Sequence, residues 1–229
     1  MRTAVIIPAA GMGKRLPGKV SKQFLDLNGH PVISWTVNKF LNLDSISAGV
    51  LVVQKDELDN AGQVFNSVPN FKQKFKIVIG GAHRQDSVFN GLSALSDKTE
   101  IVLVHDGVRP LVSPEIITEC IRIASDRGAC ITAVPAKDTI KRVQDGWVQQ
   151  TIPREQVWQV QTPQGFRYEL LYQAHQQARQ MNYYATDEAA LLEWLGIPVA
   201  VIKGEYRNIK ITTQEDLVIA KSLLEEKRV

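Results

Sequence analysis

Ile6-Ile7-Pro8-Ala9-Ala10-Gly11-Met12-Gly13-Lys14-Arg15-Leu16 is the stretch of this chain that decides its fold. In it an apolar strand, which starts at Ala4, runs into a turn of small residues and glycines. Small residues let a backbone come close to a ligand, and successive backbone N–H groups can bind phosphate oxygens. Lysine and arginine side chains, which are suited to bind phosphate, lie within or just after this stretch: Lys14, Arg15, Lys19 and Lys22. We therefore predict a polyphosphate-binding loop at the carboxyl end of a first β-strand, where open α/β sheets bind their ligands.

Two well-known phosphate-binding motifs fit this loop poorly. The dinucleotide fingerprint G-x-G-x-x-G requires a third glycine where this chain has Leu16. A Walker A loop requires a hydroxyl side chain for Mg²⁺, whereas the corresponding stretch here, Gly13–Val20, ends in a valine that cannot bind a metal. A turn between strand and helix whose basic side chains are simply solvated is the structural alternative.

The composition is that of an ordinary globular protein. The 229 residues include 22% charged residues and carry a net charge of +3, with a sequence pI of about 8.8. No dense run of lysine and arginine occurs, so we expect no nucleic-acid partner, and the small positive excess suits a small anionic substrate. No apolar run is long enough to cross a membrane, and Cys120 and Cys130 have neither metal-ligand spacing nor a disulfide framework. We expect a cytoplasmic protein with reduced, structural thiols and no membrane partner.

Strand-like and helix-like segments alternate along most of the chain. Apolar runs typical of strands cover residues 3–7, 49–54, 76–79, 101–105, 129–134 and 198–203. Helical spacing or capping signals predict helices over residues 31–41, 56–64, 88–95, 114–127, 167–181, 186–195 and 212–226. This alternation predicts an α/β fold with a Rossmann-like, mostly parallel sheet flanked by helices. Because repeats and long linkers are absent from the sequence, we expect residues 1–229 to form a single domain.

The alternation breaks at a predicted β-hairpin. Asp145-Gly146 lies between the strand-like runs 138–144 and 147–152, and Asp-Gly between two such runs is a strong hairpin signal. A hairpin cannot continue a parallel sheet, so we predict that residues 137–155, approximately, project as a β-arm. A two-stranded ribbon is only marginally stable alone in water. We therefore expect a second copy of the chain to cover the arm in a twofold-symmetric homodimer.

Two further loops follow predicted strands and carry residues suited to ligand binding. Gly80-Gly81 indicates another close backbone approach, and Ser87 is placed either to contact a ligand or to cap the next helix. Asp106 directly follows the buried strand 101–105, where a carboxylate is well placed to bind Mg²⁺. Arg109 lies close behind it, and a surface Asp–Arg ion pair is the alternative interpretation.

The loops resemble a known family when they are considered together. Pro8 to Arg15 has the pattern P-A-A-G-x-G-x-R, which resembles sugar-phosphate nucleotidyltransferases, and Ser21-Lys22-Gln23-Phe24 keeps most of the P-x-K-Q-F/Y pattern that follows it there. Further along come G-G-x-x-R-x-x-S, H-D-x-x-R-P, D-T-x-K-R, T-P-Q and N-I-K, in that order. Over nearly the whole chain this set resembles the 2-C-methyl-D-erythritol 4-phosphate cytidylyltransferase family, which belongs to the non-mevalonate route to isoprenoids.

The resemblance implies a reaction and a set of site residues. In the family, the substrate's phosphate attacks the α-phosphorus of CTP with Mg²⁺ present and releases pyrophosphate, without a covalent intermediate. The implied catalytic residues are Arg15, Lys22, Arg154 and Lys210. The implied nucleotide contacts are Pro8, Ala9, Ala10, Gly11, Met12, Gly13, Gly81, Ser87 and Gly107. The implied alditol-phosphate contacts are Asp106, which also holds the metal, Arg109, Thr139, Arg154, Thr186 and Lys210, with Thr139 and Arg154 reaching the other subunit's site.

Several alternatives stay open on the sequence alone. Taken singly, Arg154, Lys210 and Thr186 also fit a rim cation, a strand-end lysine and a helix cap. A relative that uses ribitol 5-phosphate shares the same nucleotide half. A non-catalytic nucleotide sensor predicts loss of the catalytic cations, all of which are present, and a Walker-type hydrolase predicts phosphate release without an alditol phosphate. Ser21 replaces the family's proline before Lys22, and no charged group is lost.

Overall fold

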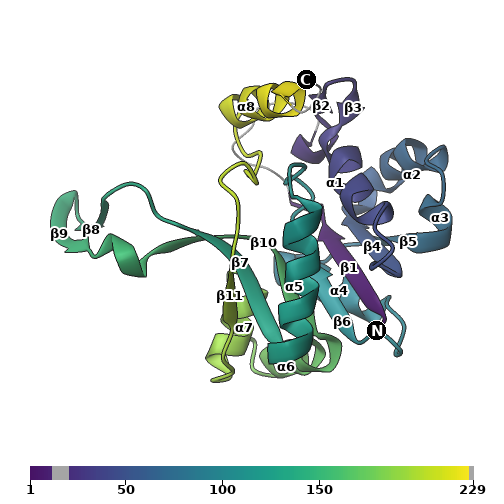
Figure 1. The fold of residues 1–229 in the computed structure, drawn as a ribbon. Helices are drawn as coiled ribbons and strands as arrows, with labels where there is room; N and C mark the ends of the chain where they lie inside the picture. Colours follow the sequence, from purple (N-terminus) through teal and green to yellow (C-terminus); the bar gives the residue numbers. More distant parts are fainter. Residues whose placement is uncertain (12–20, 227–229) are drawn as a thin grey trace.

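A seven-stranded sheet forms the centre of the molecule, with the strand order β11-β7-β10-β6-β1-β4-β5. The computed structural model describes residues 1–11 and 21–226 (Figure 1). The strands of the sheet are β1 (Thr3–Pro8), β4 (Ala48–Val53), β5 (Phe75–Ile79), β6 (Ile101–Val104), β7 (Ala129–Pro135), β10 (Trp158–Arg167) and β11 (Ala200–Lys203). The predicted α/β fold with a mostly parallel sheet is confirmed.

One strand of the sheet, β10, runs against its neighbours. β1 is parallel to β4 and β6, β4 to β5, and β11 to β7, whereas β10 is antiparallel to both β6 and β7. β10 continues to Arg167, with a bulge between Gln161 and Gln164. A bulge bends a strand without ending it, so the chain passes the T-P-Q sequence while staying in the sheet.

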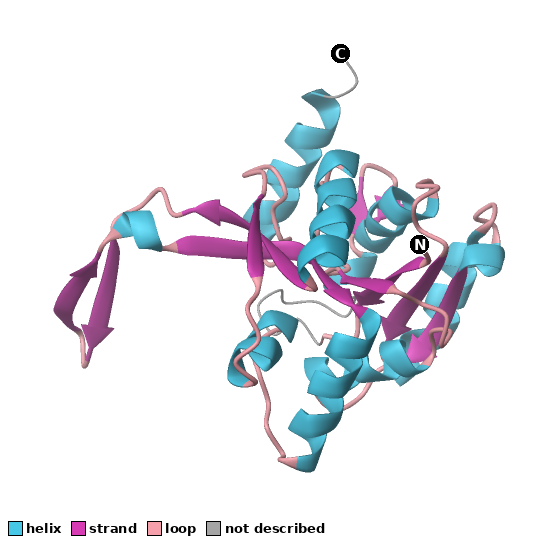
Figure 2. Cartoon of the chain, turned by 60° about the horizontal axis from the view of Figure 1, so that its bottom comes forward, coloured by secondary structure: helices cyan, strands magenta, loops and turns pink. Residues whose placement is uncertain are grey.

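Helices bury both faces of the sheet, as Figure 2 shows. Alternate residues of β1 supply the two faces, since Val5 and Ile7 belong to one apolar cluster and Ile6 to another. The first face is covered by α1 (Val32–Leu41), α2 (Leu58–Asn66), α3 (Phe71–Lys74) and α5 (Pro114–Arg127). The second is covered by α4 (Arg84–Ser93), α6 (Tyr168–Gln180) and α7 (Glu188–Trp194).

A third apolar cluster lies beside the carboxyl ends of the strands. It joins the C-terminal helix α8 (Gln214–Glu225) to Leu27, Val32 and Val108, and Val108 belongs to the loop after β6. The short elements next to this cluster are η1 (Lys22–Phe24), β2 (Asp26–Leu27) and β3 (His30–Pro31). The cluster therefore fixes α8 and the segment around η1 at the edge of the sheet where the loops carry the predicted site.

The predicted hairpin is confirmed. β8 (Ile140–Gln144) and β9 (Trp147–Ile152) pair antiparallel around Asp145 and Gly146, which have φ values of 50° and 82°. Figures 1 and 2 show this ribbon extending away from the sheet, with the short helix η3 (Arg154–Gln156) at its base. Trp147 is 76% exposed, and none of the three buried apolar clusters of the described chain includes a residue of the ribbon.

The start of α4 differs from the predicted one. The helix begins at Arg84 rather than Val88, so Ser87 is not its cap. His83 is the N-cap residue, and the carboxylate of Asp86 accepts a hydrogen bond from the backbone N–H of His83 at 3.1 Å. An acid three residues after the cap is favoured in this position because it satisfies one of the free N–H groups of the first turn.

Four other helices begin one residue later than predicted, among them α6, which begins at Tyr168 rather than Arg167. α1 begins at Val32, after Pro31. α7 is capped by Asp187 rather than Thr186, and the Asp187 carboxylate accepts from the N–H of Ala190 at 2.9 Å. α8 is capped by Thr213 instead of its neighbour Thr212. At the last two starts, neighbouring residues can both act as caps, and the packing of each helix decides between them.

The two cysteines are buried free thiols. Cys120 lies on α5 and Cys130 on β7, with their sulfur atoms 3.6 Å apart. Burial raises the pKa of the Cys120 thiol well above its usual value. No helix among the described residues combines the length and apolar character needed to span a bilayer.

Two histidines are buried in a neutral state. His175 of α6 lies beside Phe89, and neither of its ring nitrogens has a hydrogen-bond partner within the described chain. Burial, assisted by the charges of Arg84 and Arg179, lowers the pKa of His175 to about 3. Burial likewise lowers the pKa of His105, which follows β6, to about 4. Both side chains must therefore take up a proton when the protein unfolds below the ordinary histidine pKa.

We expect the protein to lose stability as the pH falls below about 6.5, the pKa of histidine in an unfolded chain. Each buried histidine then lowers the free energy of unfolding by up to about 1.4 kcal/mol per pH unit, until the pH reaches its native pKa. His175→Phe removes one of the two side chains that take up a proton on unfolding. The free energy of unfolding, measured with urea from about pH 8 down to 4.5, should therefore fall less steeply with falling pH than in the wild type. An acid slope equal to that of the wild type would contradict a buried, neutral His175.

Candidate active site

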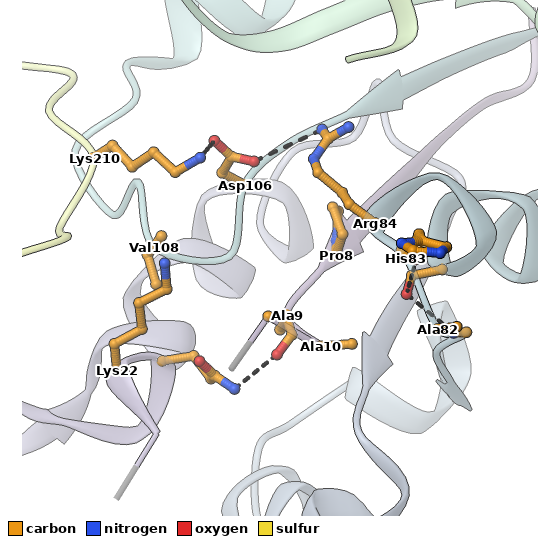
Figure 3. Close-up of a pocket in the computed structure, with 14 residues that line it drawn as sticks. Pro8, Ala9, Ala10, Lys22, Ala82, His83, Arg84, Asp106, Val108 and Lys210 are labelled. Carbon is orange, nitrogen blue, oxygen red and sulfur yellow. Dashed lines mark hydrogen bonds and ion pairs between the residues drawn. The ribbon is translucent and has the colours of Figure 1, made fainter. Parts of the chain in front are cut away.

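A cavity of about 320 Å³ opens where β1, β5 and β6 end. This is the edge at which α/β sheets bind ligands. Figure 3 shows side chains from several segments facing it, among them Lys22, Arg84, Asp106 and Lys210. The predicted site residues that line this cavity are Pro8, Ala9, Ala10, Gly11, Lys22, Gly81, Ser87, Asp106 and Lys210.

Side-chain amides hold the first loop in place after β1. The N–H of Ala9 donates to the carbonyl of Val52 at 2.7 Å. The carbonyl of Ala9 accepts from Nε2 of Gln23 at 2.7 Å, and that of Ala10 accepts from Nε2 of Gln54 at 2.8 Å. The described part of the loop therefore has a fixed backbone before any ligand binds. The predicted residues Met12, Gly13 and Arg15 lie outside the described residues.

Gln23 also fixes the segment that carries Lys22. Its side chain is 1% exposed, and its Nε2 lies 2.8 Å and 3.1 Å from the two carboxylate oxygens of Glu57. Glu57 ends the short helix η2 (Lys55–Glu57), which directly precedes α2. One buried amide group thus ties η1 both to the loop after β1 and to the start of α2, and Lys22 is the next residue along the chain.

The second loop, after β5, relies on the small size of its glycines. A Cβ atom on Gly80 would lie only 2.7 Å from both the Cβ of Ala10 and the hydroxyl of Ser87, so this glycine lets two loops of the site meet. The Ser87 hydroxyl accepts from the N–H of Gly81 at 3.1 Å and donates to the carbonyl of His83. Ser87 is therefore a loop-fixing residue in addition to being a cavity-lining one.

Asp106 is surrounded by three cations. One carboxylate oxygen lies 2.9 Å from Nζ of Lys210 and 3.5 Å from Nε of Arg109, and the other lies 3.8 Å from a terminal nitrogen of Arg84. Burial alone would raise the pKa of Asp106, but these three charges outweigh burial and hold that pKa well below its usual value. The carboxylate is thus ionised and fixed at the floor of the cavity.

A buried polar network supports Asp106 from below. Its backbone N–H donates to the Thr162 hydroxyl at 3.0 Å, and that hydroxyl lies 3.1 Å from Nδ1 of His105. The other ring nitrogen of His105 lies 3.0 Å from the carbonyl of Arg109. Asn208 donates to the carbonyl of Thr162 at 2.9 Å. The antiparallel strand β10 therefore supplies the contact that orients the backbone at Asp106.

A second cavity, of about 200 Å³, adjoins the first one. Its lining includes the predicted residues Arg109 and Thr186. Arg84, Asp106 and Lys210 line both cavities and so mark the place where they meet. Arg109 is 8% exposed, and one of its terminal nitrogens donates to the carbonyl of Asn208 at 2.7 Å, which fixes its guanidinium beside Asp106.

Three predicted residues lie away from these cavities. Gly107 packs between them and the core, since a Cβ atom there would lie 2.8 Å from Ile33 and 3.2 Å from Ala9. Thr139 and Arg154 lie at the base of the ribbon and are exposed, and Arg154 donates to the carbonyl of Lys137 at 3.2 Å. Neither lines either of the two cavities described above.

Sequence reasoning missed the residues that position the site from a distance. Gln54, Glu57 and Glu188 were not singled out as site residues, and Gln23, Arg84 and Thr162 appeared only as letters of a pattern. Their partners lie from 14 to 104 residues away in the chain, so local spacing gave no signal for these contacts. Only a pattern that included buried polar residues on several elements could have indicated them.

The fold and this site define a class of protein, the α/β nucleotidyltransferases. The family model described as 2-C-methyl-D-erythritol 4-phosphate cytidylyltransferase matches residues 3–226. A protein with that name from Halalkalibacterium halodurans is 46% identical to this chain, over 99% of both chains. Another, from Syntrophotalea carbinolica, is also 46% identical, over 98% of this chain and 97% of the relative. The chain belongs to the 2-C-methyl-D-erythritol 4-phosphate cytidylyltransferase family.

Solved structures agree with this assignment. The crystal structure of a 4-diphosphocytidyl-2C-methyl-D-erythritol synthase from Anaerococcus prevotii has a TM-score of 0.87 and 33% identity, and covers 98% of each chain. The crystal structure of a 2-C-methyl-D-erythritol 4-phosphate cytidylyltransferase from Thermus thermophilus has a TM-score of 0.80 and 33% identity, over 98% of this chain and all of that one. The similarity therefore extends over the whole fold.

We expect Gln23→Met to destabilise the protein by about 1–3 kcal/mol, because it leaves the buried Glu57 carboxylate and the Ala9 carbonyl without their donor. Urea unfolding at neutral pH measures this loss. The double variant Gln23→Met/Glu57→Met should recover part of it, since removing both partners no longer leaves a buried charge unpaired. If the double variant is less stable than the single one, Glu57 does not depend on Gln23.

Proposed function

We propose that this protein is a cytidylyltransferase that joins 2-C-methyl-D-erythritol 4-phosphate to the cytidylyl group of CTP, in non-mevalonate isoprenoid precursor biosynthesis. A phosphate oxygen of the alditol phosphate attacks the α-phosphorus of CTP. The bond to the β-phosphate breaks, and pyrophosphate leaves. The products are 4-diphosphocytidyl-2-C-methyl-D-erythritol and pyrophosphate. Family membership over residues 3–226 gives the reaction class, and the relatives' names give the substrates.

The observation that carries the proposal is the pair of adjoining cavities. A reaction between two anionic substrates needs two sites that meet, and cations where they meet to offset the repulsion between phosphates. Arg84, Asp106 and Lys210 line both cavities. We assign the larger cavity, bounded by the loops after β1 and β5, to CTP. We assign the smaller cavity, bounded by Arg109 and Thr186, to the alditol phosphate.

Each proposed catalytic residue has a charge suited to this transfer. Lys22 and Arg15 would stabilise the negative charge that develops on the α-phosphoryl oxygens, and Lys210 would orient the attacking phosphate. No nucleophilic side chain is required, because orientation and electrostatics suffice for phosphoryl transfer of this kind. The backbone of Pro8–Gly11 with Gly81 and Ser87 would contact the nucleotide, together with Met12 and Gly13, and Gly107 would support it from the core side.

Asp106 is the residue we propose for Mg²⁺. Magnesium is commonly held by one or two carboxylates together with substrate phosphates. The Asp106 carboxylate is ionised and lines both cavities where they meet, so it is available there to a metal that arrives with the phosphates of the nucleotide. Mg²⁺ bound there would neutralise charge on the phosphates of CTP.

The first test is a pyrophosphate-release assay with CTP, Mg²⁺ and methylerythritol phosphate. We expect release that requires the alditol phosphate and that falls by about 10²- to 10³-fold in Lys22→Ala, the usual loss when one charge-stabilising donor is removed. Lys72→Ala is the matched control, because Lys72 is an exposed lysine of α3 that bonds to Asn66. Calorimetry measures whether each variant still binds CTP, and so separates a loss of catalysis from a loss of the folded site.

Parallel reactions identify the alternatives. If ribitol 5-phosphate supports release and methylerythritol phosphate does not, the reaction type is unchanged but the protein belongs to another pathway. Release from CTP without any alditol phosphate would indicate a hydrolase. CTP binding without release in every reaction would contradict the proposal and favour a nucleotide sensor.

We also propose that the chain acts as one domain with the ribbon as its arm, in a homodimer whose arms complete the partner's site. Support comes from the exposed Trp147 of the ribbon and from Thr139 and Arg154, which are polar yet line neither of the two adjoining cavities of their own chain. Cytoplasmic location is part of the same proposal, in keeping with a pathway of small phosphorylated metabolites.

Mixing two inactive variants tests the exchange of arms. Lys22→Ala and Arg154→Ala each inactivate every site of their own homodimers. In a mixed dimer, one of the two sites has both residues intact, so subunit exchange at equal amounts should restore about a quarter of the wild-type activity. Analytical ultracentrifugation checks the dimer. Absence of recovery in a proven mixed dimer would place Arg154 in the site of its own chain.

A further inference from the structure

Arg84 stands in a place that local physics does not favour. It is the first residue of α4, where the positive end of the helix dipole disfavours a cation. The N-cap His83 and the returning carboxylate of Asp86 already complete this end of the helix. Because the helix dipole disfavours an arginine here, we look for its role in contacts with other elements.

The first of these contacts is with a deeply buried acid. Glu188, the first residue of α7, is 1% exposed, and its Oε1 accepts from a terminal nitrogen of Arg84 at 2.7 Å. Burial raises the pKa of Glu188, and the charge of Arg84 opposes that rise. The other carboxylate oxygen of Glu188 has no hydrogen-bond partner within the described chain. The Arg84 side chain is 33% exposed, so only the acid of this pair is fully buried. Because desolvation of a buried charge offsets much of the attraction in such a pair, stability alone does not explain it.

The second contact is with Asp106. The other terminal nitrogen of Arg84 lies 3.8 Å from Oδ1 of Asp106, on the side of the carboxylate that Lys210 and Arg109 do not occupy. Figure 3 shows Lys210, Asp106 and Arg84 in a row along the cavity. The guanidinium of Arg84 is a planar fork, so its two ends hold two carboxylates in a fixed relation. A lysine at this position would reach only one of them.

We propose that Arg84 is a positioning residue of the transfer reaction, held by Glu188 so that its guanidinium orients the carboxylate of Asp106 where the two cavities meet. This inference rests on the proposed function. The competing interpretation is a purely structural tie between α4 and α7. The two differ in what a conservative change does, because a structural tie affects the amount of folded protein and a positioning residue affects the turnover of the folded protein.

Arg84→Lys and Glu188→Gln are the two variants to measure. Arg84→Lys keeps the charge and loses the fork, and Glu188→Gln keeps the acceptor oxygen and loses the charge. Glu119→Gln is the matched control, because Glu119 holds Arg122 at the same 2.7 Å on the exposed face of α5. For Arg84→Lys we expect kcat to fall by about 10- to 100-fold, as for a small misplacement of reacting groups. Calorimetric binding of CTP counts the folded sites, so that kcat is expressed per CTP-binding site and any loss of stability seen by thermal unfolding is separated from the loss of turnover.

The double variant Arg84→Lys/Glu188→Gln tests whether Glu188 acts through Arg84. If it does, the double variant turns over no more slowly than Arg84→Lys alone, since non-additive effects are the mark of groups that act as a unit. The double variant also has a use if Arg84→Lys alone fails to fold. The change to glutamine removes the charge of the buried Glu188, which would otherwise have no arginine partner. Fully multiplied losses in the double variant would overturn the proposal.

Two other results would also overturn it. The first is unchanged kcat per CTP-binding site in Arg84→Lys, with a lowered unfolding temperature, which is the result of a structural tie. The second is a wild-type protein that binds CTP but transfers the cytidylyl group to no alditol phosphate, which removes the proposed function and this inference together. If the wild type is active and both Arg84→Lys and Glu188→Gln have the same kcat as the wild type, the inference is overturned and the proposed function stands.

Discussion

The attraction between the Asp106 carboxylate and three surrounding cations is the interaction on which the site depends. The cations come from three different parts of the chain: Arg84 from the start of α4, Arg109 from the loop after β6, and Lys210 from the segment before α8. Without a common anion, three positive charges this close together would repel one another. One carboxylate at the end of β6 therefore allows a strongly cationic surface to exist before any phosphate arrives.

The rest of the fold serves to hold that carboxylate and its neighbours still. β10, the one strand that runs against the others, places Thr162 under the backbone of Asp106. The third apolar cluster holds α8, and the preceding residues include Lys210. Gln23 and Gln54 fix the carbonyls of the first loop. Each contact joins segments far apart in sequence, so the preorganisation of the site belongs to the folded sheet as a whole.

Much of this arrangement could be predicted from the sequence, and for a definite reason. Parallel strands end at one edge of a sheet, so polar residues that directly follow apolar runs must meet there. This reasoning placed Asp106, Gly81 and the loop after β1 together. The Asp-Gly turn identified the hairpin because few residues adopt its backbone angles. Lys210 and Thr186 needed the family resemblance, because nothing local separates them from an ordinary lysine and an ordinary helix cap.

What the sequence did not indicate was decided by packing across the sheet. The reversal of β10 depends on its pairing with β6 and β7, and its own residues carry no sign of direction. Glu188 reads as a favourable acid in the first turn of a helix, and only the folded chain shows that it is buried against Arg84. At two helices the observed N-cap lies one residue after the predicted one, because two adjacent side chains can both cap. Each cap contributes about 1 kcal/mol, so the sequence does not distinguish between them.

The ribbon formed by β8 and β9 also has a consequence for the protein in concentrated solution. Each strand of a two-stranded sheet has one edge with unpaired backbone groups, and such edges pair readily with other chains. The exposed Trp147 and Val148 make this ribbon a favourable template for such pairing. The adjacent charges Lys141 and Arg142 oppose it, because two copies of β8 placed edge to edge would bring like charges together. These basic side chains of the ribbon thus work against aggregation, at a distance from the cavity of their own chain.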